Sequence, residues 1–144
     1  MYKVLHFIKR KDHLTHEQFK AHFERSHAAM ALNFCGHLFS SYQRNYLTTV
    51  YTGGDSRKEG SGYGPQAWEW DLISEWILPS EEALNEIYKI MNQPGIAELF
   101  LADEDRFIDR TATVTVPCVV CDTGTEFNPK GTVFDTPTGE PSWD

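Results

Sequence analysis

Two histidines on one amphipathic segment are the residues whose type and spacing could do chemistry. Residues 14–27, LTHEQFKAHFERSH, predict the start of a helix, because Thr15 and Gln18 fit a capping box. The inner stripe of this helix recurs at spacings of three and four, at Phe19, Phe23, Ser26, Met30 and Phe34. His27 falls within the stripe and His22 on its flank. Such an imidazole is either a core residue whose hydrogen bonds are all made within the protein or the reactive group of a pocket.

Two carboxylates on a predicted strand are candidate partners for these histidines. Residues 67–78, AWEWDLISEWIL, alternate between an aromatic face and a face that combines Asp71 and Glu75 with Ile73 and Ile77. Isoleucines are not needed on a face that is open to water, so we expect this face to be covered as well. The two acids are then either partly buried, at the mouth of a cavity, or solvated at the edge of the sheet.

Metal and nucleotide sites are not expected from the motifs. His22 and His27 are five residues apart, which separates them by about 140° around an α-helix and disfavours chelation of one ion. The glycine-rich segment TGGDSRKEGSGYGPQ, residues 52–66, precedes a strand, whereas a dinucleotide-binding loop leads directly into a helix. We interpret this segment as a hairpin loop or a lid over a pocket.

Composition indicates one globular domain that does not bind polyanions. The 144 residues include 40% hydrophobic residues, and the net charge is −8 with a pI near 5.2. Nucleic acids and anionic membranes favour clustered Lys and Arg, so both are disfavoured as partners. No apolar run approaches the roughly 18 residues of a membrane helix, and the charges at the N-terminus follow its apolar run, unlike those of a signal peptide. We therefore expect a cytoplasmic protein.

The expected elements alternate between strands and helices. Strands are predicted at 2–10, 41–51, 67–78 and 110–121, and helices at 16–34 and from Ser80 to a break at Pro94-Gly95, followed by a short helix over 96–109. Residues 122–144 are rich in Pro and Gly and are expected to form an irregular tail.

This order predicts an α+β fold of the ferredoxin-like type, β-α-β-β-α-β, with a four-stranded antiparallel sheet. Helices would cover one face of that sheet. The other face is also apolar, so it requires a second layer, and another copy of the same sheet is the simplest source. We therefore expect a homodimer with two-fold symmetry.

Four segments, in this order and spacing, resemble the EthD-domain family of the dimeric α/β-barrel superfamily. They are FIKRK at 7–11, the capped helix with Phe19, Phe23, Glu24 and His27, WDLISEW at 70–76, and LADEDRFIDR at 101–110. The resemblance spans residues 2 to about 116. It implies an EthD-like domain over 1–121 that forms homodimers and works without metal or organic cofactor. It also implies a lyase or cyclase that decarboxylates, dehydrates or cyclises aromatic or polyketide-derived molecules.

The resemblance also suggests roles for individual residues. His27 takes the place of the family's helix-one histidine, and as a buried neutral imidazole it would act as a base near pH 7. Tyr46 stands where the family often has a histidine on its second strand, and its phenol could polarise a carbonyl. Asp71 or Glu75 would orient the imidazole or return the proton. The residues expected to bind the substrate are His22, Phe23, Met30, Glu75, Trp76 and Tyr88.

Two other functions are compatible with the same fold. One is a monooxygenase, cofactor-free or haem-dependent. The other is a non-catalytic protein that binds a small molecule or assists another enzyme.

Overall fold

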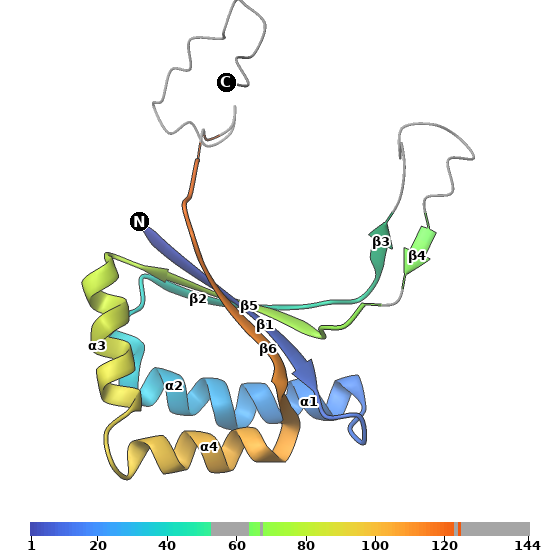
Figure 1. The fold of residues 1–144 in the computed structure, drawn as a ribbon, viewed down its shortest axis with the longest axis horizontal. Helices are drawn as coiled ribbons and strands as arrows, with labels where there is room; N and C mark the ends of the chain where they lie inside the picture. The colour runs from blue at the N-terminus through green and yellow to red at the C-terminus, as the bar shows by residue number, and fades with distance from the viewer. Residues whose placement is uncertain (53–63, 67, 123, 125–144) are drawn as a thin grey trace, which may run out of the picture.

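The computed structural model describes residues 1–52, 64–66, 68–122 and 124 (Figure 1). Its strands are β1 (Tyr2–Arg10), β2 (Ser41–Tyr46), β3 (Val50–Thr52), β4 (Gly64–Gln66), β5 (Leu72–Leu78) and β6 (Ile108–Cys118). Its helical elements are α1 (His16–His22), the π-helical turn η1 (Phe23–His27), α2 (Ala28–Cys35), the 3-10 turn η2 (Gly36–Leu38), α3 (Glu81–Met91) and α4 (Ile96–Phe107).

Four strands form one antiparallel sheet in the order β2-β5-β1-β6. Each of the two outer strands follows the helical segment that returns the chain across the sheet, which is the ferredoxin-like arrangement predicted from the sequence. β3 and β4 form a separate two-stranded ribbon. The helices lie together on one side of the sheet (Figure 1). The predicted fold is therefore confirmed.

The boundaries of three strands differ from those predicted. The second ends at Tyr46, the third begins at Leu72, and the last begins at Ile108 and ends at Cys118. Most of the glycine-rich segment and of the predicted tail lies outside the described residues. Among the described residues, none belongs to a helix long and apolar enough to cross a membrane.

Local sequence fixes where the helices begin. Thr15 and Gln18 form the predicted capping box at the start of α1, and the Ser80 hydroxyl accepts a hydrogen bond from the backbone N–H of Ala83 at the start of α3. α4 begins after Gly95, whose φ of 89° is a left-handed conformation that favours glycine. The predicted break between α3 and α4 is thus a turn at which the chain changes direction (Figure 1).

The first helix contains a π-turn that shifts the phase of its buried face. In η1, the backbone N–H of Ala28 donates to the carbonyl of Phe23, five residues earlier. Before the turn the buried residues are Phe19 and Phe23, as predicted, but after it they are Ala28, Ala31 and Cys35. Met30 and Phe34, predicted to lie on the inner stripe, are only half-buried because the extra residue rotates α2.

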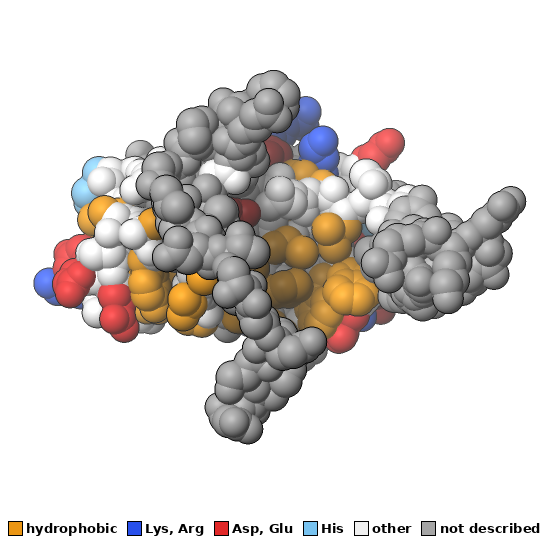
Figure 2. Space-filling model, turned by 90° about the horizontal axis from the view of Figure 1, so that it is seen from above, with side chains coloured by type: hydrophobic (Ala, Val, Ile, Leu, Met, Phe, Trp, Pro, Cys, Tyr) orange, Lys and Arg blue, Asp and Glu red, His pale blue; other side chains and the backbone are white. Residues whose placement is uncertain are grey.

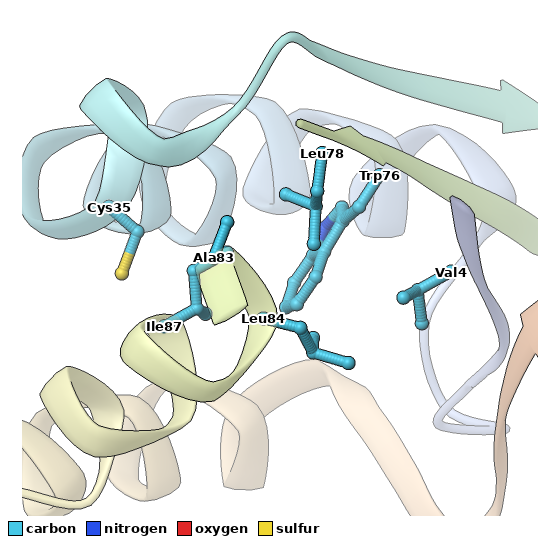
Figure 3. Close-up of a cluster of buried hydrophobic side chains, with 7 residues drawn as sticks. All are labelled: Val4, Cys35, Trp76, Leu78, Ala83, Leu84 and Ile87. Carbon is cyan, nitrogen blue, oxygen red and sulfur yellow. The ribbon is translucent and has the colours of Figure 1, made fainter. Parts of the chain in front are cut away.

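The space between sheet and helices is filled by two apolar clusters. One joins β1 and β5 to α2 and α3 through Val4, Cys35, Trp76, Leu78, Ala83, Leu84 and Ile87 (Figure 3). The other joins the sheet to α1 and to the end of α4 through Ile8, Phe19, Phe23, Ala28, Leu72, Phe107 and Ile108. The functional side chains described below are held between these two clusters.

The opposite face of the sheet carries apolar side chains that no described helix covers. Leu5 is the Cα partner of Val116, and Phe7 that of Val114, with both valines substantially exposed. Hydrophobic side chains are visible on this side in the view from above (Figure 2). An exposed apolar sheet face of this kind favours an interaction with another layer.

Candidate active site

Three side chains of the first helix converge on one buried carboxylate of α4. Asp103 accepts a hydrogen bond from the Ser26 hydroxyl at 2.7 Å and lies 2.9 Å from Nε2 of His22, both at Oδ1. Its other oxygen, Oδ2, lies 3.1 Å from Nδ1 of His27. The carboxylate is only 7% exposed. Asp103 therefore fixes the orientation of both imidazoles.

The π-turn explains how His22 and His27 reach the same carboxylate. In a regular α-helix, residues five apart point about 140° away from each other. Between these histidines the helix widens by one residue, in η1, and the angular separation decreases. π-Turns of this kind are frequent at functional sites.

Burial and hydrogen bonding set the charges of this cluster. Desolvation lowers the pKa of His27 below its usual 6.5 and outweighs the opposing effect of Asp103. Desolvation raises the pKa of Asp103, but the hydrogen bonds from Ser26, His22 and His27 together lower it by more. The pKa of Asp103 therefore lies below its usual value. At neutral pH the pair is thus a neutral imidazole held by a carboxylate. The Asp103 contact at Nδ1 leaves Nε2 of His27 as the nitrogen that could accept a proton.

A cavity of about 310 Å³ lies between the helices and the sheet, and His27 lines it. Phe23, Trp76 and Tyr88, three of the expected substrate-binding residues, line it as well. Its remaining wall is contributed by the sheet, α3 and the end of α4, through His6, Ile8, Tyr42, Ser74, Met91, Glu104, Ile108, Arg110, Thr113 and Thr115.

The carboxylates expected beside His27 lie elsewhere. Asp71 accepts a hydrogen bond from the Arg10 backbone at 2.8 Å and lies 3.1 Å from Nδ1 of His16. Glu75 forms an ion pair of 2.8 Å with Lys3 on the face of the sheet opposite the helices. β5 starts after Asp71, and its alternation turns Glu75 away from the helices. The carboxylate that holds His27 is therefore Asp103 and not Asp71 or Glu75.

Tyr46, His22 and Met30 are also not part of the cavity wall. The Tyr46 ring packs against Phe19 and Phe23, and burial raises the pKa of its phenol. Its hydroxyl is enclosed without a hydrogen-bond partner among the described residues. His22 contacts the site through its hydrogen bond with Asp103, and the phase shift of α2 explains the displacement of Met30.

Asp103 and His6 are the ionisable residues of greatest chemical interest among the site residues that sequence reasoning missed. Asp103 belongs to the LADEDRFIDR segment, which resembles a family motif but for which the sequence suggested no chemical role. His6 alternates with Val4 and Ile8, a pattern that predicts a core or interface residue. The signal for His6 that the sequence offered was a polar residue on an otherwise apolar strand face.

Comparison with known families identifies the chain. The sequence model of the EthD domain matches residues 11–111. The chain belongs to the EthD-domain family. This match confirms the resemblance inferred from the sequence motifs, and it contains both His27 and Asp103.

Solved structures agree with this assignment at the level of the fold. An ethyl tert-butyl ether D (EthD) family protein from Bacillus halodurans is 13% identical, with a TM-score of 0.52 over 84% of this chain and 99% of that chain. A protein from Arabidopsis thaliana is 15% identical, with a TM-score of 0.52 over 87% of this chain and 100% of that chain. A comparison with curated proteins gives no match.

Proposed function

We propose that this EthD-family protein is a cofactor-independent lyase or cyclase that acts by general acid-base catalysis. The observation that carries the proposal is the contact of 3.1 Å between Nδ1 of His27 and Oδ2 of Asp103, at the wall of the cavity between the helices and the sheet. A neutral imidazole in this position, oriented by a carboxylate, has the features of a general base near pH 7.

The proposed step transfers a single proton. Nε2 of His27 takes the proton from a carbon next to a carbonyl, or from a phenol, and the electron pair of the broken bond forms an enolate or phenolate. Asp103 stabilises the resulting imidazolium, which then returns the proton to the substrate or to a leaving group. Elimination and cyclisation proceed through such an anion. In decarboxylation His27 would take the proton of the carboxylic acid, the electron pair of the broken C–C bond would form the enolate as CO₂ leaves, and the imidazolium would return the proton to carbon.

The cavity wall supports an aromatic or polyketide-derived substrate. Phe23, Tyr42, Trp76 and Tyr88 provide aromatic surfaces, and Thr113, Thr115 and Arg110 provide polar groups. Apolar walls with a few polar groups are typical of sites that bind small organic molecules. A volume of about 310 Å³ suits a compound of a few fused or linked rings.

We further propose that the EthD-like domain, residues 1–121, acts as a cytoplasmic homodimer. The uncovered apolar face of the sheet, with Leu5, Phe7, Val114 and Val116, supports this assembly because two such faces can bury each other around a two-fold axis. The ion pair between Lys3 and Glu75 on the same face could orient one sheet on the other.

The test compares turnover in the wild-type protein and in the His27→Ala variant. The candidate substrates are hydroxylated aromatic carboxylic acids and aromatic β-keto acids, and mass spectrometry follows their conversion. We expect turnover to fall by about 10²- to 10⁴-fold while the folded assembly persists. His37→Ala, which removes an exposed imidazole in η2, is the matched control and should retain full activity. Unchanged turnover in His27→Ala would contradict the mechanism. Tight binding without conversion by the wild-type protein would instead favour a non-catalytic role.

A further inference from the structure

A row of polar residues crosses the helix-facing side of the sheet below His27. His6 in β1 is the Cα partner of Ser74 in β5 and of Thr115 in β6, and all three residues line the cavity. The neighbouring positions on this side of the same two central strands, Val4 with Trp76 and Ile8 with Leu72, are apolar. The polar row is therefore confined to the floor of the cavity.

His6 has an unmatched nitrogen in this floor. Its Nδ1 is enclosed and has no hydrogen-bond partner among the described residues. The adjacent Trp76 ring, whose centroid lies 4.2 Å from that of His6, likewise has an enclosed Nε1 that makes no hydrogen bond of normal geometry within the same part of the chain. An indole nitrogen can only donate, and a neutral imidazole offers one donor and one acceptor. Enclosed polar atoms of this kind are costly unless a ligand satisfies them.

We infer that the row formed by His6, Ser74 and Thr115 binds a carbonyl or phenolic oxygen of the substrate, and that His6 donates a hydrogen bond to it. This inference rests on the proposed function and assigns a second imidazole to the site. His27 would remove the proton, and His6 would stabilise the oxygen on which negative charge develops. Because Tyr46 lies outside the cavity wall, His6 takes the role that the sequence had suggested for that phenol.

The charge state of His6 suits this role. Burial, together with the nearby His27, lowers the pKa of His6 to about 4. The ring therefore remains neutral at pH 7. A neutral donor can stabilise an oxyanion without carrying a buried positive charge next to the base.

The experiment uses 4-nitrophenol as a probe, because its ionised and neutral forms absorb at different wavelengths. The pKa of the bound probe is measured by absorbance titration with the wild-type protein and with His6→Leu, which keeps a buried side chain but removes the hydrogen bond. We expect the ionisation constant of the bound probe to fall by about tenfold in His6→Leu. His6→Gln, which restores a donor, should recover part of the effect, and Thr115→Val should show a smaller loss.

The matched control is His13→Leu, at an exposed position outside this cavity, which should leave the titration unchanged. Circular dichroism checks the fold of each variant, and His6→Met, which also lacks a donor, replaces His6→Leu if the latter does not fold. Equal ionisation of the probe in the wild-type protein and in the His6 variants overturns the inference, as does failure of the wild-type protein to bind 4-nitrophenol.

Probe binding and turnover separate this inference from the proposed function. In His27→Ala the effect of His6 on the probe should persist, because it requires no proton transfer to His27. If His27→Ala retains turnover while the probe still depends on His6, the proposed mechanism fails and the oxygen-binding floor stands. If His27→Ala loses turnover while the probe is insensitive to His6, only the present inference fails.

Discussion

Nδ1 of His27 lies 3.1 Å from Oδ2 of Asp103, although 76 residues separate them along the chain. The contact joins the first helix to α4 and is nearly enclosed, so the carboxylate cannot be replaced by water without loss of orientation. Because this contact engages Nδ1, it leaves Nε2 of His27 as the ring nitrogen that faces away from Asp103.

Replacing Asp103 by Asn should reduce turnover by about 10²- to 10⁴-fold with little change in side-chain volume. The amide lacks the negative charge that stabilises the imidazolium, and its N–H₂ group favours the wrong tautomer of His27. Steady-state kinetics provides the measurement. Asp71→Asn is the matched control, since Asp71 also contacts an imidazole, that of His16, but lies away from His27. A similar loss in both variants would argue for a general effect on folding.

The pH profile of kcat/KM should have an acid limb that lies below pH 6.5. The pKa of His27 is lowered by burial, so its active neutral form predominates at pH 7 and protonates only in more acidic solution. The Asp103 carboxylate raises this pKa, so the limb should move to still lower pH in Asp103→Asn. An acid limb above pH 6.5 in the wild-type protein would be inconsistent with His27 as the base.

The free energy of unfolding should decrease as the pH falls from 6.5 towards 4, in part because of His6. The pKa of His6 is lowered from its ordinary value of 6.5 to about 4 in the folded protein, so the unfolded chain binds the proton first. The stability is fully present above pH 6.5 and is lost as the pH falls, by about 3 kcal/mol for this group alone.

His6→Leu removes this titration, so its stability should depend less on pH than that of the wild-type protein. Urea unfolding at pH 7, 5.5 and 4.5 gives the comparison. The exposed His37 provides the control, because His37→Leu should leave the wild-type pH dependence unaltered. Parallel pH dependence in the wild-type protein and His6→Leu would show that His6 is not buried as described.

Val116→Lys should convert the proposed dimer to a monomer. Val116 lies on the uncovered side of the sheet as the Cα partner of Leu5, so a lysine there would place a charge between two apolar faces. Val119→Lys is the control, because Val119 lies beyond β6 and is 96% exposed. Light scattering coupled to size-exclusion chromatography measures the mass. Two variants of equal mass would indicate that this face is not the contact.

The sequence predicted the fold well because each element carries a local signal. The alternation of β1 and the caps at Thr15 and Ser80 are short-range patterns, and the structure reproduces them. His27 was identified as a candidate for the same reason, since its place on the helix follows from periodicity.

Asp103 was missed because its role depends on tertiary contact. Asp71 and Glu75 share a strand with aromatic residues and were the more obvious partners, whereas the pairing with α4 depends on how two helices pack. The π-turn was also invisible to periodicity, because the predicted stripe of Phe19, Phe23, Ser26, Met30 and Phe34 fits a regular α-helical repeat. His6 was expected in the core or at an interface, because alternation reports the direction of a side chain and not whether a cavity lies beyond it.

The extra residue in η1 makes the length of the first helix a part of the site. Deletion of one residue between Phe23 and His27 would let this segment wind as a regular α-helix, with Phe23 and Ala28 four residues apart and still on one face. Insertion of a second extra residue would instead rotate the side chains that follow by about 100° relative to those that precede it. Either the phenylalanines would then leave the core or α2 would lose its packing, and the two imidazoles would no longer be aligned on one acid. Relatives that keep this paired arrangement should therefore tolerate substitutions along the helix far better than further insertions.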